Sequence, residues 1–290
     1  MKNNKKESIS VNNVIYVVDN IRKNKKPNSK SRGLIKKGRR LLKEGDESAA
    51  NLFGILYSDG ILFKQDLNKA IQLFLVGEKT NNYKMICNAG KACLKLSRSD
   101  ELSEKERDEM YDKAVHYATR AANSDYVPGI MFLAMIYQDW MPDGIGTDVK
   151  YEDLSDNESI KEKRLTAKEL YEKAIALGEK MAILKIADMY FWGDFEDDDI
   201  GSNAREWLFR AVEENIPSAF LKLGELYASK TNYVVEHDEL KAFTWTLKAA
   251  EAGDEIAMFN LIGMYRDGIG VEKDSEKSLY WKNKIEALPQ

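Results

Sequence analysis

The segment Lys241 to Gly253, KAFTWTLKAAEAG, decides the fold of this chain. Ala242, Trp245 and Ala249 follow one another at spacings of three and four residues, which places them on one face of a helix. Small residues on either side of a large one let a second helix approach closely, and we expect the large side chain to fill the space between them. The segment therefore predicts a tightly packed pair of helices.

The same face recurs along the chain at a fixed distance from a tyrosine. We call its first residue the small position and the residue 23 places later the tyrosine position. One active site gives no reason for such a rhythm, whereas a stack of similar helix pairs does. The pairs are Ala114 and Tyr137, Ala167 and Tyr190, Ala204 and Tyr227, and Ala242 and Tyr265, with the variants Ala70 and Cys93, and Leu34 and Tyr57.

The connections between these elements fall into two classes. Eleven residues after each small position stands a glycine, asparagine or aspartate, the types that best tolerate the left-handed conformation ending a helix. A short, constant turn is therefore expected there. The stretch from a tyrosine position to the next small position varies from 13 to 30 residues, so insertions are confined to this loop. The left-handed residues are expected at Gly45, Asn81, Asp125, Gly178, Asn215 and Gly253.

These observations predict an all-α fold, a right-handed superhelical α/α solenoid of about six helix pairs. A half-unit from Leu34 to Gly45 precedes the pairs. Residues 34–290 are expected to form the solenoid, with a long insertion at about 138–166. Residues 1–33 carry nine Lys and Arg against Glu7 and Asp19 and are expected to be a basic arm, partly disordered or holding one short helix. Such an arm could contact nucleic acid or acidic lipid, but a solvated tail is the preferred interpretation.

The C-terminal sequence resembles a known repeat family. Met258 to Ala287, MFNLIGMYRDGIGVEKDSEKSLYWKNKIEA, is similar to the Sel1-like repeat (SLR), a relative of the tetratricopeptide repeat (TPR). About six copies span residues 48–290, and the copy around Cys93 departs most from the pattern. The residues that match the family pattern in the last copy are Ala257, Leu261, Tyr265, Gly268, Gly270, Val271, Asp274, Lys277 and Trp281.

No motif in the sequence points to catalysis, a metal or a cofactor. The Gly-x-Gly elements at 143–148 and 267–274 lack the rest of a nucleotide-binding loop, and the acidic loop 194–201 lacks the spacing of a calcium loop. Ser155-Asp156-Asn157 matches one tripeptide of serine β-lactamases, but Ser-x-x-Lys and Lys-Thr-Gly are absent. We expect no enzyme activity and no cofactor; a β-lactamase-like hydrolase is the rival interpretation.

The sequence also gives expectations for compartment. Cys87 and Cys93 lie six residues apart in one predicted helix, about 9 Å at 1.5 Å per residue, which is too far for a disulfide. Free thiols, the absence of a long apolar run and the absence of a standard signal peptide predict a cytoplasmic protein.

The resemblance implies a non-enzymatic scaffold or adaptor that binds another protein or peptide through its concave groove and the loops within repeats. It names neither a small-molecule substrate nor nucleic acid as the partner. A dedicated inhibitor of the immunity type, or an effector acting on one target protein, is the alternative. By analogy with the TPR groove, positions two before each tyrosine position face the partner, and aromatics near helix ends add contacts. The candidates are Lys91, Met135, Trp140, Asp188, Phe191, Trp192 and Glu225, with Ile55 and Gly263 at equivalent positions.

Overall fold

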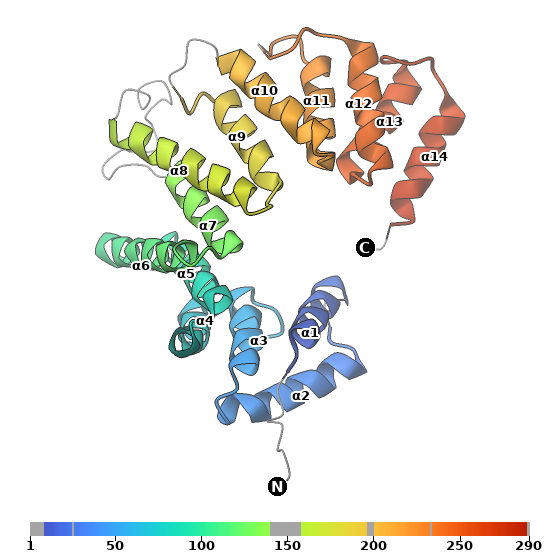
Figure 1. Ribbon diagram of the computed structural model, residues 1–290. Coiled ribbons are helices and arrows are strands. Elements are labelled where there is room, and N and C mark those ends of the chain that lie inside the picture. Colours follow the sequence, from blue (N-terminus) through green and yellow to red (C-terminus); the bar gives the residue numbers. More distant parts are fainter. Residues whose placement is uncertain (1–8, 25, 140–157, 196–199, 233, 289–290) are drawn as a thin grey trace. The chain divides into compact units, whose positions relative to one another are not determined.

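The computed structural model describes residues 9–24, 26–139, 158–195, 200–232 and 234–288 (Figure 1). The chain divides into two compact units, an N-terminal unit to Leu133 and a C-terminal unit from Ala134. Most of the described residues lie in helices, and none lies in a strand. The helices of the N-terminal unit are α1 (Val11–Asn24), α2 (Ser29–Lys43), α3 (Glu47–Ser58), α4 (Leu67–Phe74), the short 3₁₀ helix η1 (Leu75–Thr80), α5 (Tyr83–Ser97) and α6 (Glu104–Ala122).

In the C-terminal unit, as in the N-terminal one, the first and second helices of the repeats alternate along the chain. Helix α7 (Val127–Gln138) spans the boundary between the units. The prediction of an α/α solenoid is confirmed: each repeat is a first helix packed on a second helix, and neighbouring repeats share a core. The helices of the C-terminal unit are α8 (Glu158–Ala176), α9 (Met181–Phe191), α10 (Ile200–Glu213), α11 (Pro217–Ala228), α12 (Glu239–Glu251), α13 (Glu255–Asp267) and α14 (Ser275–Glu286).

The turns between repeats have the predicted backbone. All six residues expected in the left-handed region have a positive φ, because glycine has no Cβ and asparagine and aspartate tolerate this conformation. Each turn reverses the chain in a few residues and so fixes the distance from small to tyrosine position. The φ values are 78° at Gly45, 53° at Asn81, 57° at Asp125, 94° at Gly178, 56° at Asn215 and 97° at Gly253.

A recurring aspartate closes the other turn, inside the repeat. In the last repeat the Asp274 side chain caps α14 by accepting from the Lys277 backbone N–H (2.9 Å). The Asp274 backbone N–H donates to the Tyr265 carbonyl (2.9 Å), and the Lys277 ammonium lies 5.4 Å from the Tyr265 ring centroid. Asp-x-x-Lys therefore ties the second helix to the first. The same trio occurs as Asp66, Lys69 and Tyr57, and as Asp238, Lys241 and Tyr227.

These caps predict an acid-sensitive contribution to stability. Backbone N–H donation from Lys241 and Lys277, reinforced by their ammonium groups, holds the pKa of Asp238 and of Asp274 below the ordinary aspartate value. A lowered folded-state pKa gives a contribution that is complete above the ordinary range and is lost as pH falls through the lowered pKa. The thermal midpoint is expected to be steady above about pH 5 and to fall below about pH 4. The Asp238→Asn/Asp274→Asn variant, which keeps the caps but not the charges, should fall less steeply; an identical fall would contradict the assignment.

In all repeats but the last, where Trp281 is 5 % exposed as expected, the large residues that fill the core differ from the expectation. The small positions are buried as predicted, with Ala70, Ala167 and Ala242 each 0 % exposed. The expectation that Trp245 fills the space between helices is wrong: it is half-buried and stacks on Phe220, with ring centroids 6.0 Å apart. The buried filler lies four residues after the small position, because that side chain points at the first helix of its own repeat. These fillers are Phe74, Ala118, Tyr171, Leu208 and Thr246, all 3 % exposed or less.

Part of the sequence outside the regular repeats is also helical. Helix α8 starts at Glu158, so the end of the segment expected as an insertion at about 138–166 is helix; residues 140–157 lie outside the described residues. Helix α2 starts at Ser29 and crosses residue 33, where the basic arm is expected to end. Helix α1 buries Val14, Val17, Val18 and Ile21 in one cluster with side chains of α2 and α3. The division of the chain at residue 33 remains a prediction.

Candidate protein-binding surface

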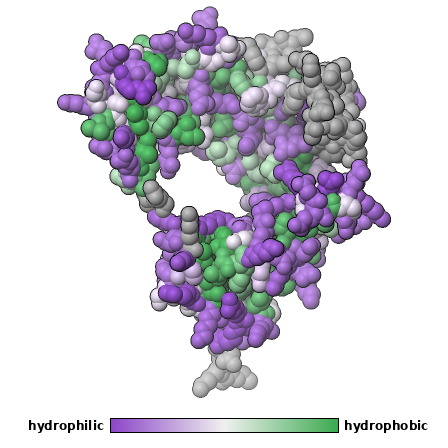
Figure 2. All heavy atoms as spheres, turned by 180° about the vertical axis from the view of Figure 1, so that it is seen from behind, coloured by the Kyte–Doolittle hydropathy of each residue, from purple (hydrophilic) through white to green (hydrophobic). Residues whose placement is uncertain are grey.

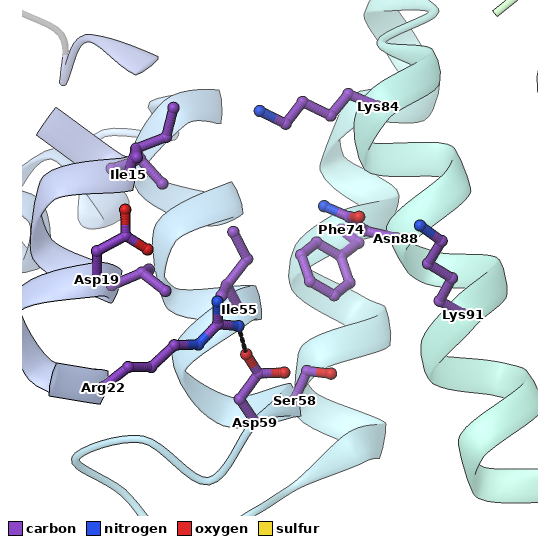
Figure 3. Close-up of a pocket in the computed structure, with 12 residues that line it drawn as sticks. Ile15, Asp19, Arg22, Ile55, Ser58, Asp59, Phe74, Lys84, Asn88 and Lys91 are labelled. Atoms are coloured by element: carbon purple, nitrogen blue, oxygen red, sulfur yellow. Dashed lines mark hydrogen bonds and ion pairs between the residues drawn. The ribbon is translucent and has the colours of Figure 1, made fainter. Parts of the chain in front are cut away.

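The N-terminal unit contains a cleft of about 330 Å³ between α1 and α5 (Figure 3). Ile15, Asp19 and Arg22 of α1 form one side, and Lys84, Asn88 and Lys91 of α5 lie across from them. Ile55 of α3 and Phe74 of α4 lie between the two sides. The predicted residues Lys91 and Ile55 therefore share one site. The other lining residues are Val14, Val18, Ser58 and Asp59.

Helical periodicity explains the α1 side of this cleft. The buried residues Val14, Val17, Val18 and Ile21 fix the rotation of α1 on the core. The flank beside them, Ile15, Asp19 and Arg22 at i, i+4 and i+7, consequently faces the cleft. Arg22 pairs with Asp59 at the end of α3, which holds the α1 side in place.

The α5 side carries positive charge. Lys84 and Lys91 are exposed and lie two turns apart, and neither forms an ion pair within the described residues. The Lys91 ammonium lies 5.8 Å from the Phe132 ring centroid. Between them Asn88 donates from Nδ2 to Oδ1 of Asn51 (3.2 Å). Two ammonium groups at the edge of an apolar floor favour a ligand that carries both a carboxylate and an apolar side chain.

A second cluster, in the C-terminal unit, joins four of the predicted residues. Lys222 of α11 pairs with the Asp188 carboxylate of α9, and its ammonium lies 4.8 Å from the Phe191 ring centroid. Phe191 meets Trp192 edge to face, with centroids 5.1 Å apart, and Trp192 is 65 % exposed. Glu225 lies one turn after Lys222 on the same helix. We call these five residues the Lys222 cluster.

The pKa of Glu225 depends on its burial and on the charged groups around it. Partial burial raises the pKa of its carboxyl, the Lys222 charge opposes that rise, and the Asp254 charge adds to it. Lys222 is not among the residues expected from the sequence, because it is neither two places before a tyrosine position nor an aromatic near a helix end. It lies one turn before the expected residue Glu225 on the same face of α11.

The remaining candidates are not brought into either group. Met135 is exposed on α7, at 37 %. Trp140 lies outside the described residues. Of the acidic loop 194–201, Asp194 is buried and its carboxylate lies 3.4 Å from the Arg164 guanidinium, which makes it an anchor for the chain entering the loop.

Among the described residues, no three His, Cys, Asp or Glu side chains gather closely enough to hold a metal ion. The two cysteines are free and buried, and burial raises the pKa of Cys93 to about 11, with Lys113 opposing the rise. That thiol is protonated at neutral pH and is no ready nucleophile. None of the described helices is both long and apolar enough to cross a bilayer.

Comparison with known proteins agrees with this architecture. The Sel1 repeat model matches residues 46–75, 91–126, 160–179, 180–215, 221–254 and 256–282. The chitin synthase regulator SKT5 of Saccharomyces cerevisiae is 29 % identical over 155 residues, which are 52 % of this chain and 20 % of that protein. The chain thus spans about a fifth of the length of this curated relative.

Two solved structures share the fold at low identity. A Sel1 repeat protein from Oxalobacter formigenes superposes with a TM-score of 0.54 at 22 % identity, covering 97 % of this chain and 99 % of that one. A protective antigen of uropathogenic Escherichia coli with an SLR fold gives 0.53 at 23 % identity, covering 87 % of this chain and 48 % of that one. The six family matches cover most of the chain, and it belongs to the Sel1 repeat family.

Proposed function

We propose that this protein is a non-enzymatic adaptor that binds a segment of another protein in the cleft between α1 and α5. Sel1 repeat proteins generally mediate protein–protein interaction, which supports a protein ligand. The observation that carries the proposal is the pair Lys84 and Lys91, which border an apolar floor without a carboxylate partner among the described residues.

The chemistry of the cleft defines the segment that fits. An acidic side chain would pair with Lys84 or Lys91, and an adjacent apolar side chain would cover Ile55 and Phe74. The volume, about 330 Å³, is at the lower end of the range for ligand pockets and suits one or two side chains of an extended peptide. Asn88 lines the cleft between the two lysines, and its amide can bond a peptide backbone.

The Lys222 cluster supports a second area of contact with a partner. Trp192 is a large exposed aromatic beside a charged network, the combination enriched at protein interfaces. Its contribution can be tested separately with Trp192→Ala, because the cluster lies in the C-terminal unit. A reducing compartment, the cytoplasm, suits such an adaptor, and the free thiols of Cys87 and Cys93 support this assignment.

Selection of a displayed library of short random peptides on the full chain tests the cleft. The selected peptides are expected to share an acidic residue next to an apolar one. The Lys84→Glu/Lys91→Glu variant should bind them at least about tenfold more weakly, because repulsion replaces the charge pairing.

The matched control reverses two exposed lysines elsewhere in the N-terminal unit. Lys36→Glu/Lys43→Glu on α2 makes the same change in net charge outside the cleft. It should leave the affinity within about twofold. Peptides without a common acidic residue, or equal losses in both double variants, would refute the proposal.

A further inference from the structure

The last repeat exposes a residue whose counterparts on the other first helices are buried or half-buried. Six places before the tyrosine position, Cys87, Leu184 and Leu221 are 8 % exposed or less, and Asn51 is 9 % exposed. Phe259 at this register on α13 is 68 % exposed. A large aromatic side chain therefore stands in solvent where four other first helices place a buried residue and α7 places the half-buried Met131.

The contacts inside the C-terminal unit show what covers this face in an earlier repeat. Leu221 of α11 shares a core cluster with Met258 and Leu261 of the following first helix, α13. One place after the small position, Phe243 of α12 meets Tyr265 of α13 edge to face, with centroids 5.3 Å apart. The residue equivalent to Phe243 on α14 is Leu279, and it is 55 % exposed. Phe259 and Leu279 are thus the side chains that a following first helix would cover, and none follows α14 in the described part of the chain.

Two charged residues distinguish this face from the earlier ones. Lys282 occupies the filler position, which is buried in every earlier repeat, and Glu286 lies one turn further along α14. Both are exposed, and within the described residues neither forms an ion pair. They are about 6 Å apart along the helix axis and lie on the side that carries Leu279. We call Phe259, Leu279, Lys282 and Glu286 the terminal face.

We propose that the terminal face joins two copies of this chain in a two-fold symmetric dimer. Any partner that covers this face also covers Lys282, and burying its ammonium group is costly without an acidic partner. A second copy supplies one: when α14 runs antiparallel to its counterpart, Lys282 meets the partner's Glu286 and Glu286 meets the partner's Lys282. Phe259 and Leu279 are buried in the same contact, as in an isologous interface.

Apolar residues also occur on the surface of the C-terminal unit. Seen from behind in Figure 2, hydrophobic residues reach the surface of the C-terminal helices among hydrophilic ones.

Sedimentation equilibrium of the full chain over a wide range of concentration tests the dimer. The wild type is expected to fit a monomer–dimer equilibrium, and Phe259→Glu is expected to be monomeric. Leu240→Glu is the control, because Leu240 is 66 % exposed on the first turn of α12, away from the terminal face. It should associate as the wild type does. A wild type that is monomeric throughout, or one that grows beyond a dimer as an open stack would, overturns the proposal.

Charge exchange tests the symmetry itself. Lys282→Glu places like charges opposite each other and should weaken association at least about tenfold. Lys282→Glu/Glu286→Lys restores both pairs in a two-fold dimer and should return the affinity to within about threefold of the wild type. If the double-exchange variant associates as weakly as Lys282→Glu, then Lys282 of one copy does not face Glu286 of the other, and the proposal fails. Far-UV circular dichroism shows whether each variant folds. If Phe259→Glu is misfolded, the charge-exchange variants still test the dimer.

Discussion

The Phe74→Ala variant is expected to unfold with a free energy about 3–5 kcal/mol lower than that of the wild-type chain. Phe74 ends α4, is 2 % exposed and packs against α3 at Gly54. Removing its ring leaves a cavity that the rigid helix pair cannot close. In a solenoid the loss falls mainly on the repeats that touch the cavity.

Hydrogen exchange measured on peptides of α3, α4 and α5, together with denaturation followed by circular dichroism, would detect this loss. The control is Leu240→Ala, at an exposed position of α12, which should change stability by no more than about 0.5 kcal/mol. All five tryptophans lie after residue 133, so their fluorescence follows the C-terminal unit alone. Unchanged protection of α3 and α4 would show that Phe74 does not hold these helices together.

The Gly54→Ala variant is expected to lose about 1–3 kcal/mol through overpacking. A Cβ at this position would lie 2.5 Å from Cε1 of the Phe74 ring, a distance that non-bonded carbons do not reach without displacement. In the Phe74→Ala background the same change should cost nothing further, because the methyl group enters the vacated space. The two effects are therefore strongly non-additive.

A second glycine provides the matched control for that prediction. Gly263 lies within α13, and apart from its chain neighbours and the backbone of its own helix nothing lies within 4 Å of a Cβ built there. Gly263→Ala should be neutral or stabilise by up to about 1 kcal/mol, because alanine favours helix. Equal losses for both glycine variants in a urea titration would show that helix propensity, and not the Phe74 ring, governs the result at Gly54.

The register of the solenoid was predictable because it depends on local chemistry. Asn81, Asp125 and Asn215 are left-handed as expected, because a residue's own side chain decides whether it tolerates that conformation. The partial exposure of Trp245 was not predictable in the same way. A face of small and large residues indicates that helices pack, but the angle between them decides which large residue is enclosed.

The candidate surfaces show the same division. The position of Lys91 on a first helix follows from the repeat, whereas its cleft requires α1, a helix outside the family pattern, to lie opposite α5. Asp188, Phe191 and Glu225 were each expected at a surface, but their connection through Lys222 arises from a contact between two first helices.

The sequence by itself determined the all-α repeat, the six left-handed turns and the edge on which insertions occur, because each depends on residues close together in the chain. Only the tertiary structure decided which side chains are enclosed, that α1 and α5 face each other across a cleft, and that Phe259 and Leu279 are exposed. These features depend on side chains from separate helices meeting in space, and spacing along one helix carries no information about its neighbours' rotation.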